Sequence, residues 1–116
     1  MPTTPRSPGF SPGDVVVVPF PFTDRTATKK RPALVCSSRA FNDASGHVVL
    51  AMITSSDHTP WPSDVRLSAN DVAGLPLAST VRWKLFTLDQ RLILRAAGAL
   101  ADSDLTACRR ASPVWG

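Results

Sequence analysis

Two apolar runs with a basic stretch between them most constrain how this chain folds. Residues 15–20 (Val-Val-Val-Val-Pro-Phe) and 32–37 (Pro-Ala-Leu-Val-Cys-Ser) have the β-branched and apolar content typical of strands. Residues 23–30 between them are polar, and the segment 25–39 holds five cations and no acid. A basic loop between two buried strands favours a phosphate-bearing ligand.

Composition narrows the fold class and the partner. The 116 residues fit one domain. Glu is absent and all nine acids are Asp, which disfavours long amphipathic helices and leaves strands and turns. The net charge of +4 and the pI of about 9.8 favour a polyanionic partner.

Short strands separated by turn residues predict a mainly β barrel or sandwich. Asn42, Asp43, Ser45 and Gly46 mark a turn, and residues 102–111 predict a C-terminal helix capped by Asp102 or Ser103. The predicted strands cover residues 15–20, 32–37, 48–54, 65–67, 80–86 and 92–100.

Residues 1–12 contain four prolines and no periodic apolar pattern, so we expect a flexible tail there. The domain is expected to span residues 13–112, followed by a short tail at 113–116. Cys36 and Cys108 fit no metal spacing and no CxxC motif, and are expected to be buried hydrophobes in a reducing cytoplasm. No apolar run reaches the ~18 residues that a membrane span needs, so we expect a soluble, cytoplasmic protein.

Arg31 and Thr54 are the first candidates for chemistry. Arg31 precedes Pro32, which restricts it to extended backbone, and its planar guanidinium can bind a phosphate through two hydrogen bonds. A solvated arginine at a strand end is the competing interpretation. Thr54, Ser55 and Ser56 follow an apolar run, and either contact a phosphate or ribose 2′-hydroxyl or form turn hydrogen bonds.

Arg82 and Lys84 share one face of the strand predicted at 80–86. They form either an electrostatic track for a nucleic-acid backbone or a solvated outer face. Trp83 faces the other way and is expected in the core, whereas Trp61, between two prolines, is a candidate for stacking on a base.

His58 lies four residues after Thr54, and histidine titrates near neutrality, so it is a candidate general base; a polar loop histidine is the simpler interpretation. His47 is expected to be exposed. The chain contains no HExxH, Walker A, GxSxG or dinucleotide motif, and no metal site is predicted.

Taken in order, these segments resemble the MazF/PemK family of toxin endoribonucleases of type II toxin–antitoxin systems. The resemblance covers roughly residues 13–111, and the ordered set is specific although no single segment is diagnostic. The matching segments are Gly13-Asp14, Lys30-Arg31-Pro32-Ala33-Leu34-Val35, Phe41-Asn42, Met52-Ile53-Thr54-Ser55, Ala73-Gly74-Leu75 and Val81-Arg82-Trp83-Lys84-Leu85-Phe86-Thr87-Leu88-Asp89.

The resemblance implies a small SH3-like β-barrel of the CcdB, Kid and MazF kind, with short helices including one at the C-terminus. It also implies a homodimer that cuts single-stranded RNA without a metal ion or other cofactor and leaves 2′,3′-cyclic phosphate and 5′-hydroxyl ends. The implied partners are RNA and a cognate antitoxin that lays an acidic segment over the RNA groove. Neither DNA nor a membrane is expected.

Matched position by position, the resemblance implies catalytic roles for Arg31, Thr54 and Arg82. Two features depart from the family. Lys84 stands where some PemK-type members use an acid, and the first-loop histidine of some members is absent, leaving only Arg25 and Thr26 nearby. The residues expected to hold RNA are Arg25, Lys29, Lys30, Ser55, Ser56, Trp61 and Lys84.

Cleavage by a 2′-hydroxyl needs a proton acceptor, a proton donor and stabilisation of a charged phosphorane. Arginine suits the last role and is a poor general base at neutral pH. Arg31 is therefore assigned to charge stabilisation, with proton donation as a further option, and Thr54 to orienting the phosphate. His58 and Asp57 are left as candidate bases.

Two other functions also fit the residues. A non-enzymatic barrel of this kind would act by binding protein, either a gyrase-like target or an antitoxin. A general RNA-binding barrel would show salt-sensitive binding without strand scission. The joint presence of Arg31 and Thr54 discriminates an enzyme from these binding modules, because a protein that only binds does not need both residues.

Overall fold

The computed structural model describes residues 9–20, 29–55 and 60–115. Its strands are β1 (Asp14–Phe20), β2 (Lys29–Val35), β3 (His47–Ser55), β4 (Val65–Arg66), β5 (Ser79–Asp89) and β6 (Arg95–Ala99). They form one antiparallel sheet in the order β4-β5-β3-β2-β1-β6. The mainly β prediction is confirmed.

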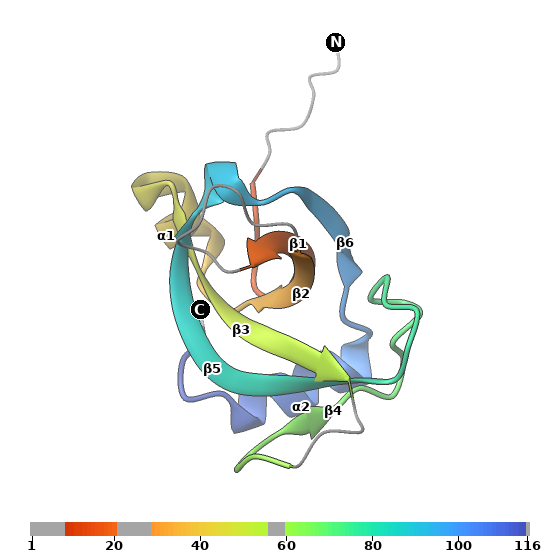
Figure 1. Cartoon of the computed structure of the whole chain (residues 1–116). Coiled ribbons are helices and arrows are strands. Elements are labelled where there is room, and N and C mark those ends of the chain that lie inside the picture. Colours follow the sequence, from red (N-terminus) through yellow and green to blue (C-terminus); the bar gives the residue numbers. More distant parts are fainter. Residues whose placement is uncertain (1–8, 21–28, 56–59, 116) are drawn as a thin grey trace, which may run out of the picture.

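The helical elements are α1 (Arg39–Ser45), the 3₁₀ turn η1 (Gln90–Leu92) and α2 (Asp102–Ala111). Figure 1 shows a strongly curled sheet, with β3 and β5 sweeping around β1 and β2 and with α2 beside β4. The predicted C-terminal helix is confirmed. Within the described ranges, no helix is long and apolar enough to cross a membrane.

The centre of the sheet is buried on both faces. Alternate side chains of a strand point to opposite faces. Val15 accordingly packs in a first cluster shared with α2, while Val16 and Val18 pack in a second cluster on the other face. The unbroken valine run in the sequence follows from this double burial, because no position in it faces water.

β2 begins earlier than the sequence predicts. Lys29 and Lys30 pair with the end of β1, so the cations up to Arg31 belong to the strand and not to the preceding loop. The prediction started the strand at Pro32 because a run of cations carries no strand signal. Backbone pairing with β1 decides the boundary.

Helix α1 replaces the turn that was predicted around residues 42–46, and that prediction was wrong. The Ser38 side chain accepts a hydrogen bond from the Phe41 N–H, and Gly46 ends the helix in the left-handed conformation with φ of 72°. A helix of two turns is too short to show the apolar periodicity that identifies longer helices.

The fully buried Asn42 side chain ties α1 to the chain before β1. Its Nδ2 donates to the carbonyl oxygens of Phe10 and Ser37 at 2.9 and 3.2 Å. Phe10 also packs against the second cluster, and Trp115 against the first. Parts of both predicted tails, 1–12 and 113–116, therefore contact the core.

Two element ends in the C-terminal half differ from prediction. The strand predicted at 92–100 is shorter, because η1 occupies its start. Helix α2 has Ala101 at its N-cap with no side-chain cap bond, so the predicted cap at Asp102 or Ser103 is wrong.

Gly74 allows residues 73–75 to cross β6 at close range. Its φ is +78°, and a Cβ there would lie 2.1 Å from the Ala97 carbonyl oxygen. This crossing positions the residues that follow, with Leu75 in the core and Pro76 and Leu77 at the surface.

Asp104 in α2 fastens the helix to the segment after β4. Its carboxylate accepts hydrogen bonds from the Ser68 N–H at 2.9 Å, the Ser68 hydroxyl at 2.8 Å and the Ala69 N–H at 3.0 Å. Burial alone would disfavour the charged form, but these hydrogen bonds outweigh it and lower the pKa of Asp104 below its ordinary value.

Asp104→Ala should lower the free energy of unfolding by about 1–3 kcal/mol, since it leaves two part-buried backbone N–H groups without their acceptor. The folded-state pKa is depressed, so this contribution is present above the unfolded value of 3.8 and is lost as pH falls through the folded value. Urea unfolding from pH 7 to pH 3 measures both effects. Thr106→Ala, at an exposed position of the same helix, is the control, and an equal effect of the two variants would contradict the assignment.

The two cysteines are buried in the first cluster, as predicted. Burial raises the pKa of each thiol to about 12; the nearby Cys108 adds to the shift at Cys36, and Asp104 adds to it at Cys108. Both thiols are therefore protonated at neutral pH.

Iodoacetamide at pH 8 should modify the native protein at least about a hundredfold more slowly than the urea-unfolded protein, because the thiolate is the nucleophile. Mass spectrometry of both cysteines over time measures the rates. Equal rates in the two states would mean that the thiols are accessible in the native fold.

Candidate active site

Arg31 and Thr54 line one pocket, near the start of β2 and the end of β3. The last pair of the β2–β3 ladder is Ala33 with Met52, and Arg31 and Thr54 each lie two residues beyond that pair, on the same face of their own strands as its members. The pocket has a volume of about 230 Å³ and is lined by Arg31, Pro32, Ile53, Thr54, Ser55, Leu75, Pro76, Leu77 and Ser79.

Neither of these two side chains has a competing polar partner in the described part of the chain. Arg31 is exposed and forms no ion pair there, and its Cζ atom lies 5.4 Å from the centre of the Phe20 ring. The half-buried Thr54 hydroxyl has no hydrogen bond to any described residue. A cation and a hydroxyl placed in this way are available to an anionic ligand.

The start of β5 completes the pocket. Ser55 pairs with Ser79 across the β3–β5 ladder, and the Ser79 hydroxyl donates to the Leu77 carbonyl at 2.8 Å. Leu77, which also lines the pocket, is 67% exposed. Ser79 and Leu77 were not predicted from the sequence, because the pairing of Ser55 with Ser79 is what brings the start of β5 to this pocket.

Arg82 belongs to a different cluster. Its Nη2 and Nε donate to the two carboxylate oxygens of Asp64 at 2.9 and 3.3 Å, and the two side chains are only 12% and 13% exposed. The hydrogen bond from Arg82 lowers the pKa of Asp64, and the same bond raises the pKa of Arg82. No sequence signal identified Asp64, which is far from Arg82 in the chain.

The same cluster contains Trp61, Trp83 and Lys84. The Lys84 Nζ lies 4.5 Å and the Arg82 Cζ 5.6 Å from the centre of the Trp61 ring. Trp83, expected in the core, is half-buried: it packs against the first cluster, and its Nε1 donates to the Ser63 carbonyl at 2.7 Å. Ala51 pairs with Leu85 but Met52 with Arg82, so β5 bulges at Trp83 and Lys84.

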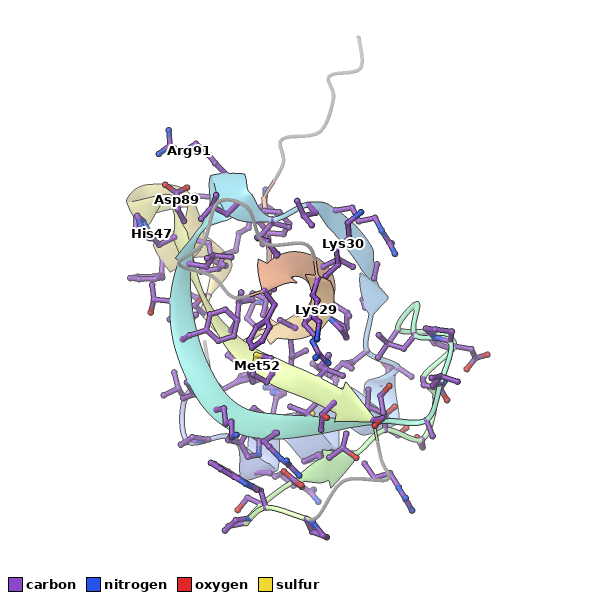
Figure 2. The ribbon with its side chains drawn as sticks, in the orientation of Figure 1. Lys29, Lys30, His47, Met52, Asp89 and Arg91 are labelled. Carbon is purple, nitrogen blue, oxygen red and sulfur yellow. The ribbon has the colours of Figure 1, made fainter. Side chains whose placement is uncertain are left out.

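Lys29 extends the positive charge of the pocket along β2. Lys29 lies two residues before Arg31 and therefore on the same face of the strand, and Figure 2 shows it on the same side of the sheet as Met52. Lys30 alternates to the other face of the strand. Four of the predicted site residues, Arg25, Ser56, Asp57 and His58, lie outside the described residues.

His47 is exposed, as predicted, and lies at the end of β3 away from Thr54. There it is grouped with Asp89 and Arg91 (Figure 2), and the side-chain hydrogen bond from Arg91 lowers the pKa of Asp89 to about 2. Among the described residues, no group of three or more His, Cys or Asp side chains is placed to hold a metal ion.

Solved structures identify the class of fold. MazF from Deinococcus radiodurans superposes with a TM-score of 0.69 at 24% identity, covering 90% of this chain and 94% of that one. A mycobacterial endoribonuclease in complex with its cognate antitoxin superposes with a TM-score of 0.68 at 20% identity, covering 90% of both chains. A MazE–MazF structure from D. radiodurans matches with a TM-score of 0.69 at 23% identity, covering 90% of this chain and 92% of that one. The fold is that of the MazF toxins.

The family follows from the sequence itself. The family model described as PemK-like, MazF-like toxin of type II toxin-antitoxin system matches residues 11–112. The chain therefore belongs to the PemK/MazF family of toxins. A comparison with curated protein sequences found no match.

The two arginines should respond differently to truncation. Arg31→Ala should leave the free energy of unfolding within about 0.5 kcal/mol, since the side chain is exposed and unpaired in the described chain. Arg82→Ala should shift the urea midpoint downward, because it leaves the Asp64 carboxylate without its guanidinium. Arg109→Ala, at an exposed position of α2, is the matched control. Equal midpoints for the Arg31 and Arg82 variants would contradict the division of roles.

Proposed function

We propose that this toxin is a metal-independent endoribonuclease that cuts single-stranded RNA. In the cell, its substrate would be mRNA in the cytoplasm. The observation that carries the proposal is the Arg31 guanidinium beside the Thr54 hydroxyl in one pocket, both without polar partners among the described residues. Family membership supports it, as does the similar mycobacterial structure that is named as an endoribonuclease.

The chemistry follows from what these groups offer a phosphodiester. The ribose O2′ attacks the adjacent phosphorus, so that the O2′–P bond forms and the P–O5′ bond breaks. The 2′ proton passes to a base and a proton is delivered to O5′. The products are a 2′,3′-cyclic phosphate and a 5′-hydroxyl. Negative charge grows on the non-bridging oxygens of the phosphorane, where a fixed guanidinium stabilises most.

Arg31 is assigned to that charge, and Thr54 donates a hydrogen bond that orients the phosphate for in-line attack. Lys29 on the same face raises the positive potential along the RNA path, and Ser55 lines the pocket beside Thr54. These cations offset the charge of the phosphate, which supports the metal independence that the family resemblance implies. The general base is assigned to Asp57 or His58.

We also propose that the toxin forms a homodimer and is inhibited by a cognate antitoxin. The related D. radiodurans and mycobacterial structures, which contain MazE and a cognate antitoxin, support the second part. A net charge of +4 favours an acidic antitoxin segment, because complementary charge accelerates association.

Cleavage of a long RNA in excess EDTA tests the enzyme assignment. Arg31→Ala and Thr54→Ala should each reduce kcat/KM by at least about a hundredfold, as the loss of one transition-state donor does in other enzymes. Sequencing selective for 5′-hydroxyl ends should map the cuts made by the wild-type protein.

Two variants far from Thr54 serve as matched controls: Arg91→Ala, in the 3₁₀ turn after β5, for the charge, and Thr87→Ala, at the other end of the β3–β5 ladder, for the hydroxyl. Both should retain activity. Full activity of Arg31→Ala would refute the assignment, and salt-sensitive RNA binding without scission by the wild-type protein would indicate a binding module.

A further inference from the structure

A second pocket lies beside the Arg82 cluster, at the end of α2. It has a volume of about 510 Å³ and is lined by Trp61, Pro62, Ser63, Trp83, Ala111 and Pro113. Two indoles and two prolines give it flat apolar walls, and the Trp61 side chain is 44% exposed. Such walls suit a planar aromatic ligand larger than a water molecule and smaller than a folded element.

The turn that carries Trp61 is held in place by several independent contacts. The Trp61 N–H donates to Asp64 Oδ2 at 2.8 Å, and the Asp64 N–H donates to the Trp61 carbonyl at 3.1 Å. Trp83 Nε1 holds the Ser63 carbonyl, and Arg82 holds the Asp64 carboxylate. Ser63 has φ of +62°, a conformation that a non-glycine residue keeps only where its surroundings impose it.

Charge around the pocket favours an anionic ligand. The Lys84 Nζ lies over the Trp61 ring and has no carboxylate partner in the described chain. Arg109 and Arg110 are exposed in the last turn of α2, which also contributes Ala111 to the pocket wall. An aromatic pocket with one cation against its indole, and two more cations in the adjoining helix turn, matches a nucleotide, which has a planar base and a charged phosphate.

Strand β5 joins this pocket to the first one. Ser79 lines the pocket of Arg31 and Thr54, and Trp83 lines the pocket of Trp61. Ser79 and Trp83 are four residues apart in β5, which corresponds to roughly 13 Å along a regular extended strand. A strand of RNA that follows β5 would place nucleotides that are close in its sequence at the two pockets.

We propose that the pocket of Trp61 and Trp83 is a base-binding subsite for the RNA substrate. An unpaired base stacks on Trp61, Lys84 contacts a neighbouring phosphate, and the Arg82–Asp64 pair positions the turn that presents the indole. Arg82 is in this assignment a positioning residue. The inference rests on the proposed function, since it names a subsite for the same RNA.

Binding of a 2′-O-methyl oligonucleotide, which cannot be cleaved, tests the subsite separately from catalysis. The sequence of the oligonucleotide covers a mapped cut site. If no cut is found, a homopolymer of each base is used instead. Fluorescence anisotropy should show that Trp61→Ala weakens binding by about 5- to 150-fold, the effect of losing one stacked base, and that Trp61→Phe retains most of the affinity. Leu92→Ala removes a side chain of similar exposure (45%) elsewhere and should have no effect.

Oligonucleotides with one abasic position at a time locate the contact. At the position of the stacked base, removal of the base should weaken binding by the wild-type protein. When that base is absent, Trp61→Ala should cause no further loss of affinity. A uniform effect of Trp61→Ala at every position, or no effect on RNA binding at all, would overturn the proposal. If Trp61→Ala instead changes only dimerisation or antitoxin binding, the pocket serves a protein partner and the RNA assignment is wrong.

Asp64→Asn tests the positioning role of the Arg82–Asp64 pair. It should weaken binding of the intact oligonucleotide but not of the one that lacks the stacked base, whereas a general structural defect would weaken both. Arg31→Ala should abolish cleavage and leave the abasic pattern unchanged, so the failure of catalysis and the failure of the subsite are distinguishable.

Discussion

The antiparallel ladder between β3 and β5 is the interaction on which the other features depend. All nine residues of β3 take part, from His47 opposite Asp89 to Ser55 opposite Ser79. A slip by one residue would move Leu50 and Ile53 out of their clusters, so burial on both faces specifies the register. That register then determines which β5 residues lie beside Thr54.

Two arginines that look alike in the sequence lie in different environments. Arg31 stays exposed at the pocket, while Arg82 pairs with Asp64 in a half-buried setting. A guanidinium that is already neutralised by a carboxylate contributes less net positive potential to a bound phosphate. The two arginines carry the same charge but have different roles, because Arg82 is paired with a carboxylate and Arg31 is not paired with any described one.

Much of the fold could be predicted because its signals are local. The valine run of β1 and the alternation around Trp83 identified strands without knowledge of their neighbours. The prediction of α1 failed because its stabilising contacts are long-range: Asn42 bonds to Phe10, on the other side of β1 and β2 in the chain. The predicted cap of α2 at Asp102 or Ser103 was also wrong, because Asp102 is already the first helical residue and Ala101 occupies the N-cap position.

For this protein, the sequence by itself determined the mainly β class, the family resemblance and the two side chains Arg31 and Thr54, because each depends on residue types in order along the chain. Only the tertiary structure decided that those two share a pocket with Ser79 and that Arg82 is held by Asp64. Such pairings depend on strand register and on the bulge in β5. Both are set by burial over the whole sheet and leave no local mark in the sequence.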